Sequence, residues 1–273
     1  MTPNKLLLIF FLITFGSQLS RAQEGGNWEL GVMAGGSGYM GDLNQNNPIK
    51  ISGFSAGAFG KRNFNQYFGV RLNYTYGQVE ANDAKSDNTQ VRDRNLRFKT
   101  SLSELSAIVD FNLFNFKLGG GNREFSPYIF AGAGGVIFKS TVKYDGEKYR
   151  LDRLATEGQD NAYNNVVLTI PYGIGLRYNY KDTWSVFSEI GYRTPMTDYI
   201  DDVSGRYPLD PDRQVKVGNP LVNLTNPADP NNPNYPNIGV PGTQRGDFRK
   251  RDTYLFVSVG ISFTFVSSKC YSF

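Results

Sequence analysis

The sequence predicts an all-β protein: a transmembrane up-and-down antiparallel β-barrel of about eight strands, of the outer-membrane type. Three observations predict it. Residues 168–180 alternate apolar and polar side chains without a break, which is the period of a strand with two differently solvated faces. This run exceeds the usual strand length of about 5 to 6 residues and has aromatic residues near its end, as a membrane-crossing strand needs. Long and short connections also alternate along the chain, as in exported barrels.

The expected strands follow the same alternation in order along the chain. They cover residues 28–39, 51–61, 68–77, 97–114, 125–144, 167–180, 184–193 and 252–266. The strand at 125–144 is rich in glycine and alanine, and its two faces stay unassigned. The short turns are expected at 63–66, 118–124 and 181–183. An even number of strands puts both ends of the chain on the side of these turns, which we expect to be periplasmic.

The longer connections are expected to be irregular. The segment 80–95 is charged and is predicted to be a helix-free loop. The tract 196–251 is dense in proline and asparagine, which predicts a long extracellular loop without sheet pairing.

Residues 1–22 are predicted to form a cleaved signal peptide. Lys5 precedes an apolar run of about ten residues, and the small residues Ser20 and Ala22 precede a cleavage site before Gln23. The apolar run is too short to span a bilayer. We therefore expect one barrel domain at 23–273, exported to the outer membrane and surrounded by its lipid.

The polar faces of the strands carry charges of both signs. A network of these charges inside the barrel would neutralise itself and fill the lumen, since about eight strands leave room only for side chains. The candidates are Arg71, Glu104, Asp110, Arg177, Glu189 and Arg193. Two alternatives stay open: the charges lie near the strand ends in water, or the chain is a soluble barrel of lipocalin type with an apolar interior.

The composition removes several classes of chemistry. The chain has no histidine, which excludes Ser-His-Asp and Cys-His catalysis and the usual zinc sites, so we expect no catalytic residue, metal ligand or cofactor. The net charge of +4 is too small to indicate nucleic-acid binding, and the single cysteine, Cys270, excludes an internal disulfide. No small-molecule substrate is indicated. Aspartates cluster at Asp198, Asp201, Asp202, Asp210 and Asp212, but without EF-hand spacing, so they are interpreted as a solvated, hydrogen-bonded loop base.

Two short blocks carry a family resemblance. They are GYMGDL at 38–43 and TDYIDDVSG at 197–205, followed by Tyr207 and, after the last strand, a cysteine. Together with the barrel pattern they resemble the PorG-like outer-membrane barrels of Bacteroidetes. The matching positions are Gly38, Tyr39, Gly41, Asp42, Thr197, Asp198, Tyr199, Asp201, Asp202, Ser204 and Gly205. The resemblance implies a non-enzymatic component of the type IX protein secretion and gliding motility machinery, which attaches the periplasmic ring of a lipoprotein and its partner protein to the outer membrane.

Three functions remain open at this point. The barrel is a structural anchor that binds partners through its periplasmic turns and C-terminal tail, a small channel, or an adhesin that uses the loop at 196–251. An aromatic residue, Phe273 or Phe265, is the candidate signal for barrel assembly, with a simple periplasmic tail as the alternative for Phe273.

Overall fold

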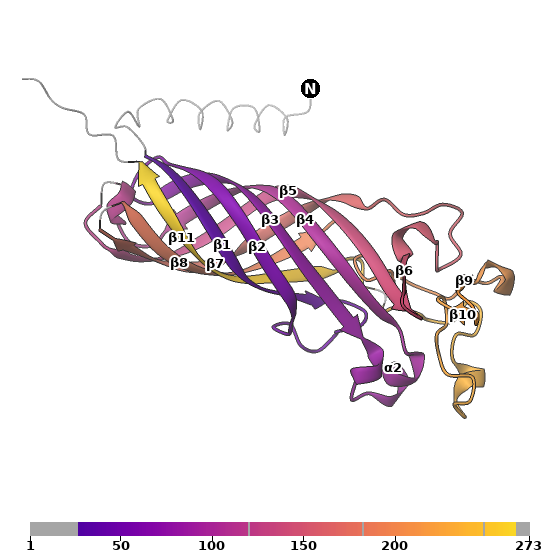
Figure 1. The fold of residues 1–273 in the computed structure, drawn as a ribbon. Helices are drawn as coiled ribbons and strands as arrows, with labels where there is room; N and C mark the ends of the chain where they lie inside the picture. Colours follow the sequence, from indigo (N-terminus) through magenta and orange to yellow (C-terminus); the bar gives the residue numbers. More distant parts are fainter. Residues whose placement is uncertain (1–26, 120, 182, 248, 266–273) are drawn as a thin grey trace, which may run out of the picture.

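The computed structural model describes residues 27–119, 121–181, 183–247 and 249–265. The expected signal peptide, Cys270 and Phe273 lie outside the described residues. Long tilted strands form one barrel, with the connections gathered at its two ends (Figure 1). In this part of the chain, no helix has the length and apolar character needed to cross a membrane.

Eight antiparallel strands close the barrel, which confirms the predicted fold class. They are β1 (Trp28–Met40), β2 (Ile51–Asn63), β3 (Phe68–Asn82), β4 (Arg97–Asn112), β5 (Phe125–Tyr144), β7 (Val166–Tyr180), β8 (Trp184–Pro195) and β11 (Thr253–Phe265). Sequential neighbours pair with one another, and closure comes from β1 pairing with β11. Closure leaves no barrel strand with an open edge, which a lipid environment requires.

The outward faces of these strands form an apolar belt. Its exposed members are Leu30, Val32, Leu72, Leu105, Val109, Ile129, Ile137, Leu168, Ile170, Ile174, Leu176, Val186, Ile190, Val259 and Ile261. Aromatic side chains border the belt at the end that carries β7's C-terminus, where the Trp184 and Phe263 rings lie 5.1 Å apart. On β5, Ile129 and Ile137 face outward, so the strand whose faces the sequence left unassigned follows the same rule. The soluble-barrel alternative is therefore wrong, because the outer face of the strands is apolar and the interior contains charged side chains.

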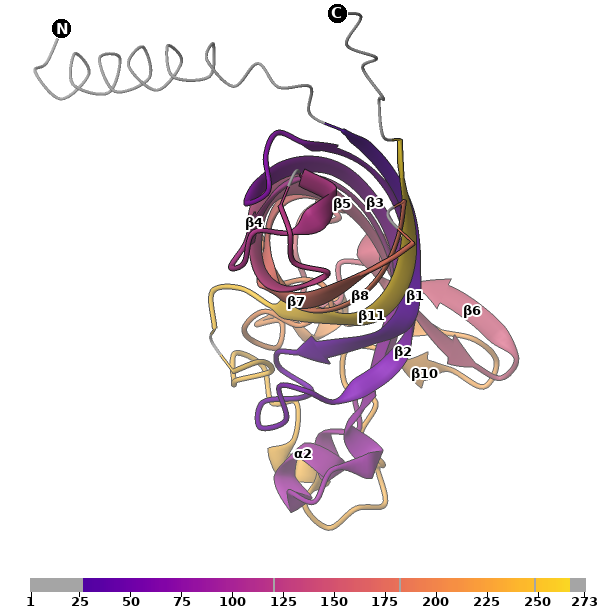
Figure 2. The ribbon, with the colours of Figure 1, turned by 90° about the vertical axis from the view of Figure 1, so that its left-hand side faces the viewer.

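The turn end of the barrel carries the connections 64–67, 113–124 and 181–183. The expected turn at 118–124 is wrong in its start, because β4 ends at Asn112 and the chain then folds back across the barrel mouth. The short helix η3 (Lys117–Gly119) lies in front of this opening (Figure 2). Phe116 and Leu118 are buried there, so these apolar residues cover the interior instead of facing solvent.

The loop end carries the connections 41–50, 83–96, 145–165 and 196–252. Segment 83–96 is not helix-free: it contains η2 (Asp83–Lys85) and α2 (Thr89–Arg94), each begun by an asparagine side chain that accepts a backbone N–H. The expected loop also starts too early, because β3 continues to Asn82. Asparagine capping is a local signal that the charged composition of this segment concealed.

The remaining loop-end elements are short. After β5, the strand β6 (Glu147–Arg150) extends the sheet as a hairpin, followed by η4 (Leu151–Arg153). The tract after β8 holds η5 (Pro211–Arg213), η6 (Tyr235–Asn237) and a small hairpin of β9 (Lys216–Val217) with β10 (Val222–Asn223). The expectation of no sheet pairing in this tract is thus wrong for these four residues, which lie before its densest proline run.

Candidate functional site

The interior of the barrel near the turn end is filled by ion pairs centred on Asp110. Three cations from three other strands surround this carboxylate: Lys61 Nζ lies 2.8 Å from Oδ2, Arg71 Nε 3.2 Å from Oδ1, and Arg177 Nη2 3.3 Å from Oδ2. All four side chains are buried. Each stands on the inward face of its strand because alternate residues of a strand point to the same side.

Two further carboxylates balance these cations. Arg71 Nη1 lies 2.6 Å from Glu189 Oε1, and the Tyr128 hydroxyl donates to the same oxygen at 2.6 Å. Glu29 accepts hydrogen bonds from Asn63 Nδ2 and Ser262 Oγ and faces Lys61 at 3.9 Å. The three cations thus meet three carboxylates, which offsets part of the cost of burying each charge.

Aromatic rings line the faces of the buried guanidinium groups. Arg177 lies 4.3 Å from the centroid of the Tyr128 ring, and Arg71 lies 5.1 Å from that of Phe130. Several nitrogens of these two arginines have no hydrogen-bond acceptor, and the ring faces supply a cation–π contact in place of one.

A second ion pair lies farther toward the loop end. Arg193 Nε is 3.5 Å from Glu104 Oε2, which also accepts the Tyr254 hydroxyl at 2.8 Å. The Arg193 guanidinium lies 4.6 Å from the centroid of the Phe256 ring. The six charged residues singled out from the sequence therefore lie inside the barrel, in these two clusters, and none lies at a strand end in water.

Sequence reasoning missed two members of the first cluster, Lys61 and Glu29. The signal was present, because Phe59, Lys61 and Asn63 alternate on β2 and all three are buried. Lys61 stood at the last position of its expected strand, where a charge is normally interpreted as solvated. The structure continues β2 to Asn63, which places Lys61 inside the barrel.

Above the ion pairs, toward the loop end, the interior is apolar. Buried side chains from five barrel strands and from two loop-end connections form one cluster: Tyr39, Val79, Phe98, Leu102, Val136, Phe138, Val142, Leu151, Ile200, Leu224, Tyr254 and Phe256. Ile200 comes from the long tract and is fully buried in it. Its carbonyl accepts hydrogen bonds from Thr100 Oγ1 at 2.6 Å and from Ser140 Oγ at 2.8 Å, which fixes this tract against the inner face of the paired strands β4 and β5.

The two blocks that carry the family resemblance meet at this point and form a cap over the barrel. The hydroxyl of Tyr39, at the end of β1, donates to Asp201 and lies 3.4 Å from Asp252 Oδ1. Asp252 Oδ2 in turn accepts the Ile200 N–H at 2.9 Å. A Cβ atom on Gly41 would collide with Asp252 and with the Tyr39 hydroxyl, so a side chain there would displace these two groups.

The second half of the cap is organised by Arg245. Its guanidinium donates to the Asp202 carbonyl at 2.6 Å and pairs with Glu157 at 3.1 Å. Glu157 also accepts the backbone N–H groups of Ser204 and Gly205, at 2.9 and 3.2 Å. Arg245 and Glu157 were not singled out from the sequence because they lie in irregular segments, where no periodicity assigns a side chain to a face.

The aspartates of the cap are not the solvated loop base that the sequence indicated. Asp42, Asp201, Asp202 and Asp252 are buried, and Asp198 is half-buried. Asp202 accepts the Thr156 hydroxyl at 2.6 Å and the Tyr163 hydroxyl at 2.9 Å. Of the five aspartates in the original cluster, only Asp210 and Asp212 are exposed.

The remaining positions of the two blocks support the cap through the backbone. Thr197 Oγ1 accepts the Tyr199 N–H at 3.2 Å, and the Tyr199 ring stacks on Tyr163 with centroids 4.6 Å apart. A Cβ atom on Gly38 would collide with the Lys50 carbonyl, which lies on the adjoining connection. These residues hold the two blocks in place beside the barrel mouth.

Burial shifts the acidity of the cap. Burial raises the pKa of Asp42 to about 8 and the pKa of Asp202 to about 6, in the latter case against the lowering effect of Arg245. Burial also raises the pKa of Asp198 to about 6. The pKa values of Asp201 and Asp252 are raised by burial and by the neighbouring aspartates. The folded cap therefore favours protonated carboxyl groups.

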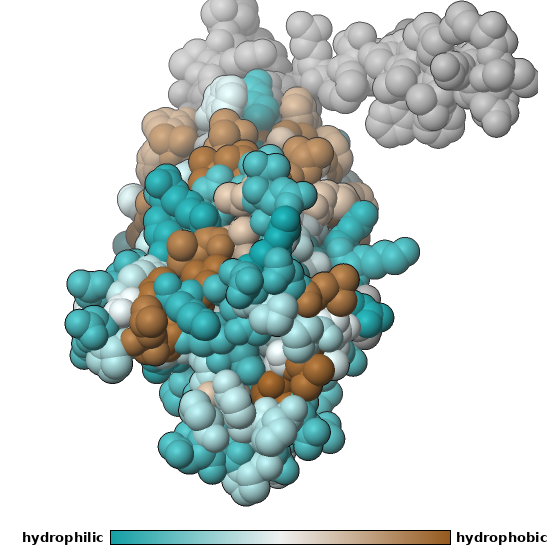
Figure 3. Space-filling view, turned by 90° about the vertical axis from the view of Figure 1, so that its right-hand side faces the viewer, coloured by the Kyte–Doolittle hydropathy of each residue, from teal (hydrophilic) through white to brown (hydrophobic). Residues whose placement is uncertain are grey.

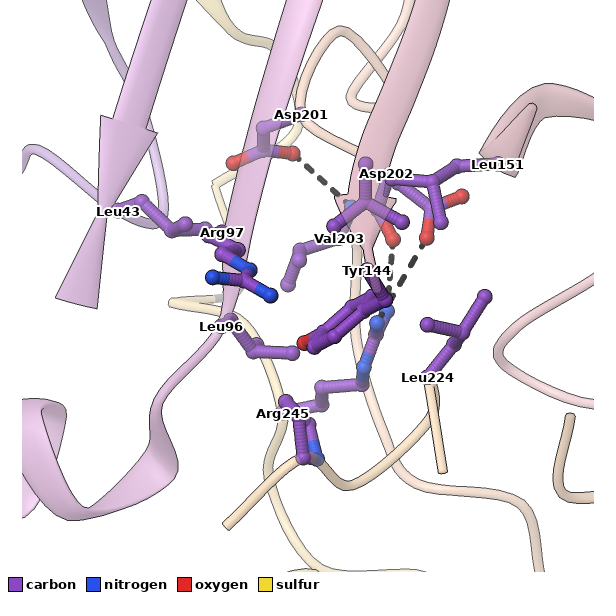
Figure 4. Close-up of a pocket in the computed structure, with 12 residues that line it drawn as sticks. Leu43, Leu96, Arg97, Tyr144, Leu151, Asp201, Asp202, Val203, Leu224 and Arg245 are labelled. Carbon is purple, nitrogen blue, oxygen red and sulfur yellow. Dashed lines mark hydrogen bonds and ion pairs between the residues drawn. The ribbon is translucent and has the colours of Figure 1, made fainter. Parts of the chain in front are cut away.

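The cavity beneath the cap is small. Its volume is about 10 Å³, and its lining includes Leu43, Tyr144, Asp201, Val203 and Arg245 (Figure 4). About one water molecule fits such a space. Among the described residues, no group of three or more acidic or cysteine side chains is arranged to hold a metal ion. The arrangement thus packs and seals the barrel mouth.

A closed barrel of eight strands with a lipid-facing apolar belt and a filled interior defines the class of small outer-membrane β-barrels. Within that class, the chain belongs to the family described as domain of unknown function DUF6089, whose model matches residues 4–223.

Solved structures offer distant likenesses. A major outer membrane protein of Thermus thermophilus is 12% identical, with 89% of this chain and 100% of that chain covered and a TM-score of 0.43. The attachment invasion locus protein Ail of Yersinia pestis is 12% identical, with 89% and 100% covered and a TM-score of 0.40. The outer membrane protein OprG of Pseudomonas aeruginosa is 10% identical, with 89% and 98% covered and a TM-score of 0.40. No curated protein matches the chain.

Proposed function

We propose that this protein is a non-enzymatic, non-conducting barrel that anchors a periplasmic complex to the outer membrane. We infer that the complex consists of the ring lipoprotein and its partner protein of the type IX secretion and gliding machinery. The identity of this complex is inferred from the resemblance of residues 38–43 and 197–205 to PorG-like barrels.

One observation carries the anchoring part of the proposal: the interior is filled from end to end. Phe116 covers the turn end, ion pairs around Asp110 fill the adjoining half, and the apolar cluster with Ile200 fills the rest. A barrel of this width holds only side chains, and a filled one offers no path for solutes. Its working surfaces are then its two ends.

The turn end is the candidate docking surface for the periplasmic partners. Phe116 and Leu118 are buried, whereas the exposed residues of the 113–124 connection are Leu113, Phe114, Lys117, Asn122, Arg123 and Glu124. Asn65 and Lys181 are exposed in the two other turns. The three turns that carry these residues lie at the same end of the barrel, around its mouth (Figure 2).

Crosslinking and mass spectrometry on membranes containing the tagged protein test the anchoring role. We expect crosslinks from the turn end to a periplasmic lipoprotein, and their loss in the double variant Arg123→Glu/Lys181→Glu. The matched control is Lys216→Glu/Lys250→Glu, which reverses two exposed charges at the loop end and is expected to keep the crosslinks. Crosslinks that survive the turn-end variant, or that identify no periplasmic component, would remove the proposal.

Planar-bilayer recording tests the alternative of a small channel. We expect no stable ohmic conductance from the purified protein, because the ion pairs and the cap occupy the lumen. A steady pore current from the wild-type chain would favour the channel instead.

A surface-binding role for the long loop is the second candidate. The side chains of Leu209 and Leu221 are 83% and 73% exposed at the loop end, where the surface is otherwise largely hydrophilic (Figure 3). A partner protein that bound this loop would remove these two side chains from water. The variant Leu209→Ser/Leu221→Ser is expected to lower cell adhesion while leaving turn-end crosslinks unchanged, and unaltered adhesion would dismiss this candidate.

A further inference from the structure

A basic groove lies on the outer wall of the barrel at the loop end. Its volume is about 660 Å³, and its lining holds six cationic side chains and a single acidic one, Glu80. The cations are Lys50, Lys85, Arg97, Lys99, Lys143 and Lys148. They come from β4, from the β5–β6 hairpin and from the connections before β2 and after β3, so the fold gathers them from distant parts of the sequence.

Few of these charges are neutralised within the protein. Lys99 Nζ lies 3.6 Å from Glu80 Oε2, where both side chains are about half exposed. The Arg97 guanidinium lies 3.9 Å from the centroid of the Tyr144 ring, which fixes its position without removing its charge. In the described part of the chain, no carboxylate lies within 4.0 Å of Lys143 or Lys148.

The strand register places two of these lysines directly against each other. Lys143 on β5 is the cross-strand partner of Lys148 on β6, and directly paired residues point to the same face. Lys99 pairs with Thr141, two residues from Lys143, so its ammonium shares this face. Like charges placed opposite one another destabilise a hairpin. An anion bound between Lys143 and Lys148 would relieve this repulsion.

The groove is continuous with the apolar belt. Ile137 of the belt is followed on the same face of β5 by exposed Lys139, then by Thr141 and Lys143. Exposed Ile51 also lines the groove, from β2. A molecule with acyl chains against the belt therefore presents its headgroup to the groove, whereas a soluble anion gains nothing from this continuity.

We propose that the groove binds the headgroup of a multiply phosphorylated lipid in the leaflet at the loop end of the barrel. Phosphate oxygens accept hydrogen bonds from the lysine ammonium groups, and the acyl chains lie along Ile137 and its neighbours on the belt. The volume exceeds that of a lone phosphate and lies in the range of specific ligand sites, roughly 300 to 1,000 Å³. The six cations match a headgroup that carries more than one phosphate.

Native mass spectrometry of the detergent-purified full chain, titrated with diphosphorylated lipid A, measures this binding. The test variant is Lys143→Gln/Lys148→Gln, and the control is Lys216→Gln/Lys250→Gln. With about a fivefold effect for each lysine near a phosphate, the test variant is expected to bind roughly 25-fold more weakly. The control is expected to bind like the wild type, and monophosphorylated lipid A more weakly than the diphosphorylated form.

The test variant is expected to lose lipid binding without losing stability. Removal of the repulsion between Lys143 and Lys148 is expected to leave the unfolding midpoint of the lipid-free protein unchanged or raised. A loss of lipid binding then reflects the groove and not misfolding. Equal affinity of the test variant and the wild type would overturn the proposal. Displacement of lipid A by inorganic phosphate at matched ionic strength would also overturn it, because the site would then hold a soluble anion.

Discussion

The two halves of the barrel interior are filled in different ways. Near the turn end, charged side chains from the strands themselves pair around Asp110, and every partner arrives by strand alternation. Near the loop end, an apolar cluster is completed by Ile200 from the long tract and covered by buried aspartates. The turn-end half is filled by side chains of the barrel strands, and the loop-end half is filled in part by a loop that inserts into the barrel.

This difference separates two kinds of stability. The turn half depends on a balance of opposite charges that water does not reach, so breaking one pair leaves a buried charge without a partner. The loop half depends on the packing of a loop and on protonated carboxyl groups, so it responds to cavity formation and to pH. We therefore expect a change in one half to have its main effect in that half.

The largest effect is expected from Asp110→Ala. This change leaves Lys61, Arg71 and Arg177 without their shared carboxylate, and loss of one partner of a buried ion pair costs about 3–5 kcal/mol. Urea unfolding in detergent, followed by the fluorescence of Trp28 and Trp184 at the turn end, measures the loss of unfolding free energy.

The control for this change is Asp160→Ala. Asp160 lies 2.8 Å from Arg213 but is 82% exposed, and exposed ion pairs contribute little. We expect no measurable change in its urea midpoint. Similar losses from both variants would mean that burial does not decide the worth of these pairs.

The second effect is expected from Ile200→Ala. Its side chain is fully buried between the barrel mouth and the cap, and removal of a buried isoleucine to alanine costs about 2–5 kcal/mol. The cost falls on loop closure, so hydrogen exchange of residues 197–205 is expected to accelerate while the tryptophan-reported unfolding midpoint shifts little. Leu209→Ala, at an exposed position of the same tract, serves as the control and is expected to change neither. A large shift of the midpoint would show that the two halves unfold as one.

The inward direction of the charged side chains in the turn half could largely be predicted from the sequence. Arg71, Asp110 and Arg177 stand at alternate positions of clean strands, so their shared inward direction follows from the period of two. The individual ion pairs could not be predicted. They depend on the order and register of strands that are far apart in the chain. Lys61 was not predicted to be buried because its strand ends two residues later than expected.

The cap could be predicted from the sequence only in part. The aspartates at 201 and 202 were visible as a cluster, but a carboxylate in a proline-rich loop is solvated in most proteins, and composition predicts that outcome. Burial comes instead from the insertion of Ile200 and from contacts with Tyr39, which lies 162 residues from Asp201 in the chain. No local pattern reports a contact of that range. Helix capping by Asn88, by contrast, was a local signal overlooked within a charged segment.

The smallest of the three effects is a pH dependence confined to the cap. Because burial raises the pKa of these carboxyl groups, the stability they contribute is complete below the ordinary aspartate pKa. It is lost as the pH rises through about 6, for Asp198 and Asp202, and about 8, for Asp42. Exchange protection of residues 197–205, corrected for the intrinsic rate, is expected to fall on the order of tenfold between acidic and alkaline pH.

A matched variant and an internal reference sharpen this comparison. Asp42→Asn keeps that position neutral at every pH, so the part of the loss near pH 8 is expected to shrink in it. Protection of the β3 segment in the turn half is expected to stay constant, because the buried partners of Arg71 on this strand are Asp110 and Glu189 and not the carboxyl groups of the cap. A parallel fall of protection in both halves would mean that the cap and the charge-paired interior respond to pH as a single unit. That result would contradict the expectation that the pH dependence is confined to the cap.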